Sequence, residues 1–343
     1  MTDLPEDARK TRISLARRLL MAAGAGMISL AVLGTACSWL PVAPWFLEGA
    51  AYWVPVYLAL GLAGTLVCLV VGRRAWALAG GACVCAVAGL MIPCYLTSPN
   101  AAPPGTAPNL RILQANVYEH RGSAAALMEL IGRERPDVVL LQEADEEWER
   151  RLLPLESDYP HKAFLPRSAR GKPDLGLYWR GNLDEPRALA AQGIPAVLLE
   201  MQVNGRAVAL LNVHPSAPFL PGRARHHREQ MTALAEFVRG LKTLPILAGD
   251  LNSSPWSQQC RALQQSTGLV SVRQGRGILG TWPSFFGPLR VGIDQVLVSP
   301  EIQVVGCRVG SGIGSDHRPL ITEFRIAAPG AADGAGQWLT GQR

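Results

Sequence analysis

Long uncharged apolar stretches fill most of the first hundred residues. No charged side chain occurs in residues 19–46, 49–72 or 75–96. A helix needs about 20 predominantly apolar residues to cross the hydrocarbon core of a bilayer. The pattern therefore predicts three transmembrane helices, at about residues 19–41, 50–72 and 75–96.

Basic residues flank these stretches unevenly. Five precede the first stretch, Arg73 and Arg74 separate the second from the third, and residues 41–49 and 97–110 contain none. Because Lys and Arg favour the cytoplasmic side, residues 1–18 should be cytoplasmic. The chain after the third span should then lie outside the cytoplasm, which predicts a multi-pass protein of the cell (inner) membrane. A signal peptide cleaved near "LGTAC" is the alternative, which the long basic lead and the misplaced leucine disfavour.

Beyond the third stretch the pattern changes to short apolar runs. "LTSPNAAPPGTAPN" has the composition of a linker, so residues 97–109 are predicted to connect two domains. Runs typical of buried strands follow in "NLRILQANV", "DVVLLQEA", "RAVALLNVH", "LPILAGDLN" and "IDQVLVS", and helical periodicity occurs at 123–136 and 225–242. We expect a mixed α/β domain over residues 110–326 and a flexible tail at 327–343.

Polar residues with metal-binding or acid–base chemistry follow several of these runs. In chain order they are Asn116, Glu143, His214, Asp250, Asn252, Asp294, Asp316 and His317. Hard divalent cations bind carboxylate and amide oxygens, so Asn116, Glu143 and Asp316 are candidate ligands of Mg²⁺, with Mn²⁺ as the alternative ion. A carboxylate beside an imidazole fixes its tautomer and raises its pKa. His317 is therefore a candidate acid or base, with Asp294 or Asp316 as its orienter.

Five motifs, "LQANV", "LLQEAD", "GDLN", "IDQVLVS" and "SDH", occur in this order after apolar runs. Together they resemble the endonuclease/exonuclease/phosphatase superfamily, which has the fold of pancreatic-type deoxyribonuclease, abasic-site endonucleases, neutral sphingomyelinases and inositol polyphosphate phosphatases. The resemblance covers about residues 110–326 and none of the apolar helices. It implies a four-layer sandwich of two facing β-sheets flanked by helices, preceded here by three transmembrane helices. The chain looks like a membrane-anchored bacterial member.

The resemblance also implies roles for the motif residues at the metal. Asn116 and Glu143 would bind the ion, with Asp316 adjoining it. Asp250 would activate the attacking water or assist the leaving group. Asn252 would orient Asp250 and a phosphate oxygen.

Two histidines complete the set that the resemblance implies. His317 would contact the scissile phosphate, supported by Asp294. His214 matches a second histidine that helps to protonate the leaving oxygen. Which residue acts as the general base stays open at this point, because coupled groups share their titrations.

Side chains outside the motifs are further candidates for substrate contact. Tyr118, Arg121 and Arg223 could line a phosphate-binding mouth, although the basic cluster at 223–228 is equally typical of a solvated helix face. The aromatic residues of "TWPSFFGP" precede the Asp294 strand, where they could touch a base, a lipid or the core.

Charge and missing motifs narrow the substrate class. The whole chain carries a net charge of +6, but residues 97–343 carry only +3, because seven of the 33 basic and four of the 27 acidic residues lie in 1–96. That is weak for a protein dedicated to duplex DNA, so a phospholipid competes with nucleic acid as substrate. "GxxxxGK[ST]", "HExxH" and "GxSxG" are all absent, which disfavours nucleotide-driven, zincin and serine-hydrolase chemistry.

The sequence thus predicts a Mg²⁺-dependent hydrolase that cleaves a phosphodiester, in nucleic acid or in a lipid headgroup, by water attack at an extracytoplasmic site. Its expected partners are that substrate and the lipid bilayer, and nothing implies a protein partner. A phosphomonoesterase of the same family and a catalytically silent, membrane-tethered binding module are the alternatives. Pairing of Cys260 with Cys307 in an oxidising compartment is left open.

Overall fold

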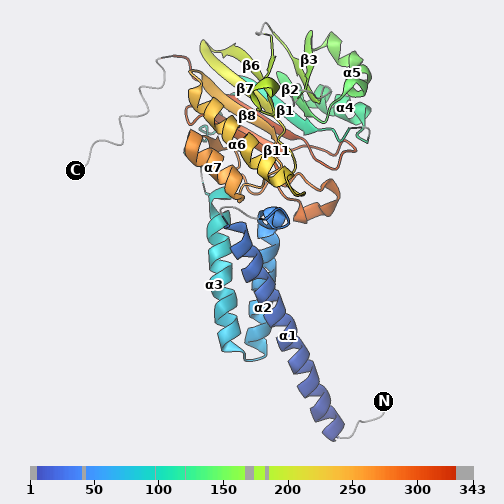
Figure 1. Ribbon diagram of the computed structural model, residues 1–343, viewed down its shortest axis with the longest axis vertical. Helices are drawn as coiled ribbons and strands as arrows, with labels where there is room; N and C mark the ends of the chain where they lie inside the picture. The colour runs from blue at the N-terminus through green and yellow to red at the C-terminus, as the bar shows by residue number, and fades with distance from the viewer. Residues whose placement is uncertain are drawn as a thin grey trace, which may run out of the picture. The chain divides into compact units, whose positions relative to one another are not determined.

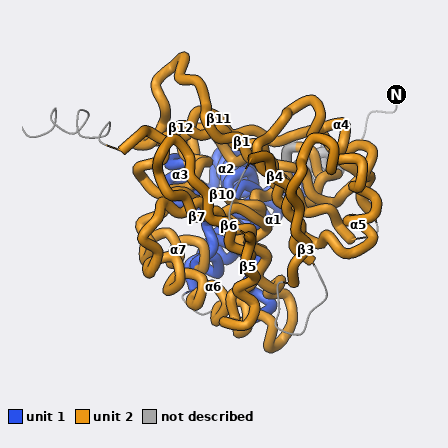
Figure 2. Tube along the Cα trace, turned by 90° about the horizontal axis from the view of Figure 1, so that it is seen from above, with its two compact units in different colours: residues 1–93, 256–258 blue, residues 94–255, 259–343 orange. Residues whose placement is uncertain are grey.

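The computed structural model describes residues 6–40, 44–96, 98–119, 121–166, 174–181 and 185–329. The chain divides into two compact units, which are coloured separately in Figure 2. Unit 1 comprises residues 1–93 and 256–258, and unit 2 comprises residues 94–255 and 259–343. The first five residues of the expected cytoplasmic segment, and the expected tail from residue 330 onward, lie outside the described residues.

Unit 1 is built from three long helices, α1 (Glu6–Ser38), α2 (Val54–Val70) and α3 (Arg74–Met91), with two short 3₁₀ helices, η1 (Glu48–Trp53) and η2 (Ile92–Cys94). The stretches Leu15–Ser38, Glu48–Val70 and Arg74–Cys94 are each long and apolar enough to cross a membrane. Glycines let α1 and α2 approach closely, since a Cβ on Gly64 would lie 2.8 Å from the carbonyl oxygen of Gly24.

Unit 2 contains two six-stranded mixed sheets. Their strand orders are β11-β12-β1-β2-β4-β3 and β5-β6-β7-β8-β10-β9. Each sheet has a central parallel pair, β1–β2 or β7–β8, and its other neighbours pair antiparallel. The strands are β1 (Leu110–Asn116), β2 (Val138–Gln142), β3 (His161–Leu165), β4 (Leu175–Trp179), β5 (Arg187–Ala188), β6 (Ala196–Val203), β7 (Arg206–Val213), β8 (Leu244–Asp250), β9 (Val270–Ser271), β10 (Asp294–Val298), β11 (Gln303–Val309) and β12 (Leu320–Arg325).

Helices cover the outer face of each sheet. Those on the first sheet are α4 (Ala124–Glu134) and α5 (Glu146–Arg151), and those on the second are α6 (Arg223–Gly240) and α7 (Gln258–Thr267), on opposite sides of the strands in Figure 1. Three 3₁₀ helices, η3 (Leu153–Ser157), η4 (Ala190–Gln192) and η5 (Ser284–Leu289), lie in connections. This four-layer sandwich, preceded by three long apolar helices, confirms the predicted fold class.

Alternation along the strands produces three apolar layers in unit 2. On β1, Ile112 contributes to the layer between the sheets, whereas Leu113 packs with the residues of α4. Leu140 and Leu141 repeat the alternation on β2. Because both faces of these central strands are covered, their sequences are continuous apolar runs, which is why the runs predicted them.

The segment before β1 is attached to unit 2 by hydrogen bonds. The Asn100 side chain donates to the carbonyl of Ile302 at 3.0 Å, and the Asn100 carbonyl accepts from the amide of Val304 at 2.8 Å. The amide of Gly277 donates to the carbonyl of Cys94 at 2.7 Å, at the residue where the third apolar stretch ends. The segment predicted as a linker therefore follows the surface of unit 2 closely.

The two cysteines whose pairing the sequence left open are both free thiols. Burial raises the pKa of the Cys260 thiol to about 11 and also raises the pKa of Cys307. A buried thiol that stays protonated is a weak nucleophile, so both cysteines act as packing residues.

Candidate active site

At one edge of the sandwich, the side chains between the sheets change from apolar to polar. Strand side chains alternate with a period of two, so each polar group continues the inward-facing row of its own strand. The rows are Ile112, Gln114 and Asn116 on β1; Leu140 and Gln142 on β2; Leu210, Asn212 and His214 on and just after β7; Ala248 and Asp250 on β8; and Val296 and Asp294 on β10. Five strands from both sheets thus direct polar groups to one place.

Buried amides join the two sheets at this edge. Gln142 Nε2 donates to Asn212 Oδ1 at 2.6 Å, and Asn212 Nδ2 donates to the carbonyl of Leu141 at 3.0 Å. Gln114 Nε2 donates to Asp294 Oδ1 at 3.1 Å. None of these three amides was predicted from the sequence. Gln114 and Asn212 each stand two residues before a selected residue on the same row, Asn116 and His214, and Gln142 ends its strand. The period of two along the strands is the signal that would have found Gln114 and Asn212.

His317 lies between two carboxylates. Asp250 and Asp294 are paired directly across β8 and β10. His317 Nδ1 donates to Asp294 Oδ2 at 2.8 Å, and its Nε2 lies 3.7 Å from Asp250 Oδ2. Like charges that face each other across strands repel, so an imidazolium between these two acids is favourable.

The charges at this triad shift its titrations strongly. Burial lowers the pKa of His317, but the charges of Asp294 and Asp250 outweigh burial and raise the pKa to about 10. Burial raises the pKa of Asp294, and the charge and hydrogen bond of His317 outweigh it and lower that pKa. At neutral pH the side chains are therefore an imidazolium held by a carboxylate, with a second proton donor site at Nε2 directed toward Asp250.

His214 approaches Asp250 from the other side. Its Nε2 lies 3.9 Å from Asp250 Oδ2 and 3.9 Å from Glu143 Oε1, and its Nδ1 lies 3.5 Å from Asp174 Oδ2. Asp174, just before β4, therefore lies beside Nδ1 of His214, as Asp294 lies beside Nδ1 of His317, but at a longer distance. Asp174 was not predicted from the sequence because it precedes its strand and belongs to none of the five motifs.

Asn116 connects the first sheet to these acids. Its Nδ2 donates to Glu143 Oε1 at 2.9 Å and to Asp250 Oδ2 at 3.1 Å, while its Oδ1 accepts from the amide of Tyr118 at 3.0 Å. The nitrogen of this amide, not its oxygen, faces the carboxylates. Metal ligation through Asn116, which needs the oxygen, stays a prediction. Burial raises the pKa of Glu143, and the neighbouring His214 and the hydrogen bond from Asn116 oppose the rise.

The backbone around the acids adopts unusual conformations. Glu143 and Asn252 have φ values of 56° and 46°, in the left-handed region that side chains other than Asn and Gly rarely adopt. The turn at Asn252 lets its amide donate to Asp250 Oδ1 at 2.8 Å, and its Nδ2 donates to the carbonyl of Pro215 at 3.0 Å. Asn252 therefore orients Asp250 through its backbone. Gly249 is needed because a Cβ there would lie 1.9 Å from the carbonyl oxygen of Val213.

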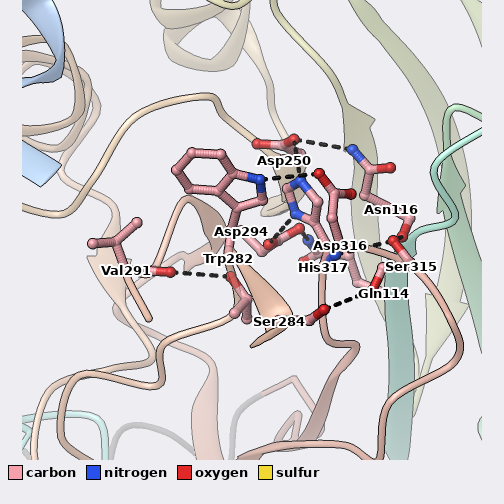
Figure 3. A network of polar contacts seen from close by, with 12 residues as sticks. Gln114, Asn116, Asp250, Trp282, Ser284, Val291, Asp294, Ser315, Asp316 and His317 are labelled. Atoms are coloured by element: carbon pink, nitrogen blue, oxygen red, sulfur yellow. Dashed lines mark hydrogen bonds and ion pairs between the residues drawn. The ribbon is translucent and has the colours of Figure 1, made fainter. Parts of the chain in front are cut away.

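Asp316 lies on the loop before β12, beside the indole of Trp282 (Figure 3). Trp282 Nε1 donates to Asp316 Oδ2 at 3.1 Å, whereas Asp316 Oδ1 is buried and has no hydrogen-bond partner among the residues that the structure describes. The Trp282 and His317 rings lie with centroids 6.5 Å apart. Ser284 holds the same loop, donating from its amide to the carbonyl of Asp316 at 2.7 Å and from its hydroxyl to that of Ser315 at 2.8 Å.

Two groups of side chains have ligand atoms close enough to share a metal ion. Glu143, His214 and Asp250 form one group, and Asp250, Asp294 and His317 form the other, with all atoms of a group within 4.8 Å of one another. The first group contains Glu143, which the sequence predicted as a ligand, and the second contains none of the predicted ligands. Asp316 belongs to neither group, but its buried Oδ1, which accepts no hydrogen bond from the described residues, is a further candidate oxygen ligand for a cation.

The three predicted substrate-contacting residues are more dispersed. Tyr118 follows Asn116 directly, and the Arg121 guanidinium lies 5.5 Å from the centroid of the Tyr118 ring. Arg223 is the exposed first residue of α6. Contact of these side chains with a phosphate remains a prediction.

The sequence left open whether the basic cluster at 223–228 lines a phosphate-binding site or forms a solvated helix face. Neither description covers the whole cluster, because His227 within it is completely buried. His227 Nδ1 donates to the carbonyl of Ser216 at 2.8 Å, and its Nε2 accepts from the Ser253 hydroxyl at 3.0 Å. One turn later, Gln230 Oε1 accepts from the amide of Ser216 at 2.8 Å. Helix α6 therefore fixes the segments that follow His214 and Asn252. Helical spacing with buried Met231 was the available signal.

His227 predicts an acid-sensitive contribution to stability. Burial lowers the pKa of His227 to about 4, so the unfolded chain takes up this proton at a higher pH than the folded chain. Stability from His227 is complete above about pH 6.5 and falls as the pH drops toward 4, by about 2 kcal/mol between pH 7.5 and 5. We expect His227→Gln to reduce the difference in unfolding temperature between these two pH values, measured calorimetrically on the full chain in detergent. His226→Gln, on the exposed neighbour, should leave that difference unchanged; an equal effect of both substitutions would contradict the assignment.

Comparison with known proteins agrees with this architecture. The sequence profile of the Endonuclease/Exonuclease/phosphatase family matches residues 113–317. No match is found among curated proteins. A conserved protein of unknown function from Enterococcus faecalis V583 has a similar fold, with a TM-score of 0.53 at 17% identity, over 64% of this chain and 100% of that one.

Two further solved structures share the fold at low identity. TDP2 from D. rerio, solved in complex with a single strand DNA product, gives a TM-score of 0.53 at 17% identity over 63% of this chain and 99% of its own. The human Nocturnin catalytic domain, solved with bound sulfate anion, gives a TM-score of 0.51 at 20% identity, over 65% of this chain and 96% of its own. At such identities these likenesses concern the fold of unit 2.

Proposed function

The chain belongs to the endonuclease/exonuclease/phosphatase family, and from that premise we propose that it is a metal-dependent phosphodiesterase that attacks its substrate with water. Family and fold support a hydrolase of phosphate esters. The single observation that carries the finer proposal is the position of Asp250 Oδ2, 3.9 Å from Nε2 of His214 and 3.7 Å from Nε2 of His317. A buried carboxylate between two imidazoles is suited to accepting a proton from water, while an imidazole beside it gives a proton to the leaving oxygen.

In this proposal Asp250 takes the proton of the attacking water, because it is the acid that both histidines and Asn116 approach. His317, protonated at neutral pH, donates through Nε2 to a phosphoryl oxygen and offsets its growing negative charge. His214, oriented by Asp174, delivers a proton to the leaving oxygen. Asn252 keeps Asp250 in position through its amide.

The chain's own donors fit a hard divalent cation. Burial raises the pKa of Glu143, and Asp316 Oδ1 is buried with no hydrogen-bond partner in the part of the chain that the structure describes. Both are oxygen ligands of the kind that Mg²⁺ and Mn²⁺ prefer. Glu143 would hold the ion, with Asp316 adjoining it, and a bound ion would polarise the phosphoryl oxygens as a Lewis acid.

We place this site outside the cytoplasm, at the inner membrane. Three helices of sufficient length and apolarity precede unit 2, which supports membrane association. The distribution of Lys and Arg around them, with none in residues 97–110, supports an extracytoplasmic unit 2. The domain division predicted from the sequence, with a catalytic domain at 110–326, is part of this proposal.

A panel of substrates tests the proposal on the full chain in detergent. It contains bis(para-nitrophenyl) phosphate, para-nitrophenyl phosphate, single-stranded DNA, RNA, phospholipid vesicles and inositol phosphates, each with Mg²⁺ and with chelator. We expect metal-dependent cleavage of the soluble diester and of one natural class. Faster cleavage of the monoester would instead favour the phosphomonoesterase, and no cleavage by folded, metal-binding protein would favour the silent binding module.

A further inference from the structure

The loop that carries η5 exposes large apolar side chains next to the candidate active site. Phe285 is 75% exposed and Leu289 is 50% exposed, and Phe286 packs edge-on against Phe285 with ring centroids 5.1 Å apart. Single exposed apolar residues are normal, but several on one short segment are typical of an interaction surface.

The charges around this loop have one sign. Residues 272–293 contain no acid, and of their three arginines Arg276 and Arg290 are partly exposed, whereas Arg273 is buried. The second loop beside the site, which follows His214, has the same character: residues 214–228 contain no acid, and Leu220 in that loop is 50% exposed. Aromatic and aliphatic side chains combined with arginine and without acids are typical of protein surfaces that rest in the headgroup region of a bilayer.

Unit 2 follows a candidate membrane span directly in the chain. Cys94 is the last residue of the third apolar stretch, and its carbonyl accepts from the amide of Gly277, eight residues before Phe285. Asn100 is bonded to Ile302 and Val304. The membrane that takes these apolar stretches is therefore the one to which unit 2 is tethered.

The same loop is attached to the candidate catalytic residues. Trp282 donates to Asp316, and Ser284 donates to the carbonyls of Ser315 and Asp316, one and two residues before His317 (Figure 3). A surface that rests against Phe285 and Leu289 would therefore be presented close to the reacting groups.

We propose that the Ser284–Leu289 loop, together with Leu220, rests in the headgroup region of the membrane that the chain's own helices cross, and that the substrate is a phosphodiester of a lipid headgroup there. The substrate part of this inference rests on the proposed function. Insertion of the loop does not, so the two are tested separately.

Insertion is measured without catalysis. The full chain carrying Phe285→Trp is reconstituted in nanodiscs of phosphatidylcholine, with and without bromine on the acyl chains, and its tryptophan fluorescence is compared with that of the unmodified chain. We expect added fluorescence from position 285 that brominated lipid quenches. Leu153→Trp is the matched control, because Leu153 is 51% exposed on η3. A tryptophan at position 153 should add fluorescence that brominated lipid does not quench. Equal quenching of both positions, or of neither, overturns insertion.

Substrate class is measured with Phe285→Ser and Leu289→Ser in the same nanodiscs. Each substitution removes a large apolar side chain that the bilayer would bury, so we expect release of phosphorylated headgroups from phosphatidylcholine or phosphatidylglycerol to fall by about tenfold or more. Hydrolysis of bis(para-nitrophenyl) phosphate and the effect of Leu153→Ser should stay near unmodified values. An equal fall for both substrates, or a selective fall for an RNA or DNA oligonucleotide, overturns the lipid assignment. Quenching at position 285 without hydrolysis of any substrate would retain insertion and reject the proposed function.

Discussion

Replacing Asp250 with Asn is expected to lower kcat for the soluble diester by about 10³-fold or more. The substitution removes the carboxylate that lies between His214 and His317, and with it the proposed acceptor of the water proton. In the unmodified chain Asn116 Nδ2 donates to Asp250 Oδ2. The substitution places an amide nitrogen or a less basic amide oxygen at that position. Single-turnover rates of the full chain with saturating substrate, measured with Mg²⁺, give the effect on chemistry.

Folding must be separated from chemistry in this variant. Asp250 is buried and its Oδ1 accepts from the amide of Asn252, a bond that an Asn side-chain oxygen can retain. We therefore expect the unfolding temperature of Asp250→Asn to change by only a few degrees. The control Asp158→Asn, which replaces an exposed acid, should change neither the unfolding temperature nor kcat. Turnover within about tenfold of the unmodified chain would reject Asp250 as the general base.

Removal of divalent metal is expected to abolish turnover, and Mg²⁺ is expected to restore it. Glu143 is a largely buried carboxylate and Asp316 Oδ1 accepts no hydrogen bond from the described residues, so a cation would stabilise both oxygens as well as supplying its chemistry. Glu143→Gln should raise the Mg²⁺ concentration for half-maximal rate by at least about tenfold, since one ionised ligand is lost.

A second readout tests the same site without turnover. A ligand that binds only the folded chain raises its unfolding temperature with concentration. We expect Mn²⁺ to stabilise the unmodified chain and to stabilise Glu143→Gln only at higher concentration, whereas Glu229→Gln, at an exposed position of α6, should match the unmodified chain. Full turnover in excess chelator, or identical stabilisation of both variants, would contradict metal dependence at Glu143.

Five of the eight residues selected from the sequence stand at or just after the end of a strand, which explains why they could be found: Asn116, Glu143, His214, Asp250 and Asn252. Central strands covered on both faces are continuous apolar runs, and these residues follow such runs. Asp294 begins its strand, Asp316 and His317 precede theirs, and all three were found through the order of the motifs. The structure brings Asn116, Glu143, His214, Asp250 and His317 together across both sheets. Their roles remain predictions, and Asn116 illustrates why. Sequence specifies an amide at that position but not which end of it faces the acids.

The residues that the sequence analysis missed obey other rules. Asp174 precedes its strand, so no apolar run marks it, and its distance of 3.5 Å from His214 depends on how β4 pairs in the sheet. His227 stands among arginines, and only its helical spacing relative to Met231 separates it from the exposed positions. Tertiary pairing and helix rotation decide both positions, and neither can be read from local composition.

The hydrogen bonds between Gln142 and Asn212 and between Gln114 and Asp294 give the sandwich a mechanical role in catalysis. Asn116 and Glu143 lie at strand ends of the first sheet, and His214 and Asp250 at strand ends of the second, so the distances between these candidate groups are set by the alignment of one sheet on the other. A slide of the sheets by a fraction of an ångström would leave the fold intact while separating Asn116 from Asp250. The rate of turnover should thus depend more steeply on sheet alignment than the stability of the fold does. Replacing Leu210, in the core between the sheets, with a smaller residue should lower turnover even at temperatures well below the unfolding temperature of the variant.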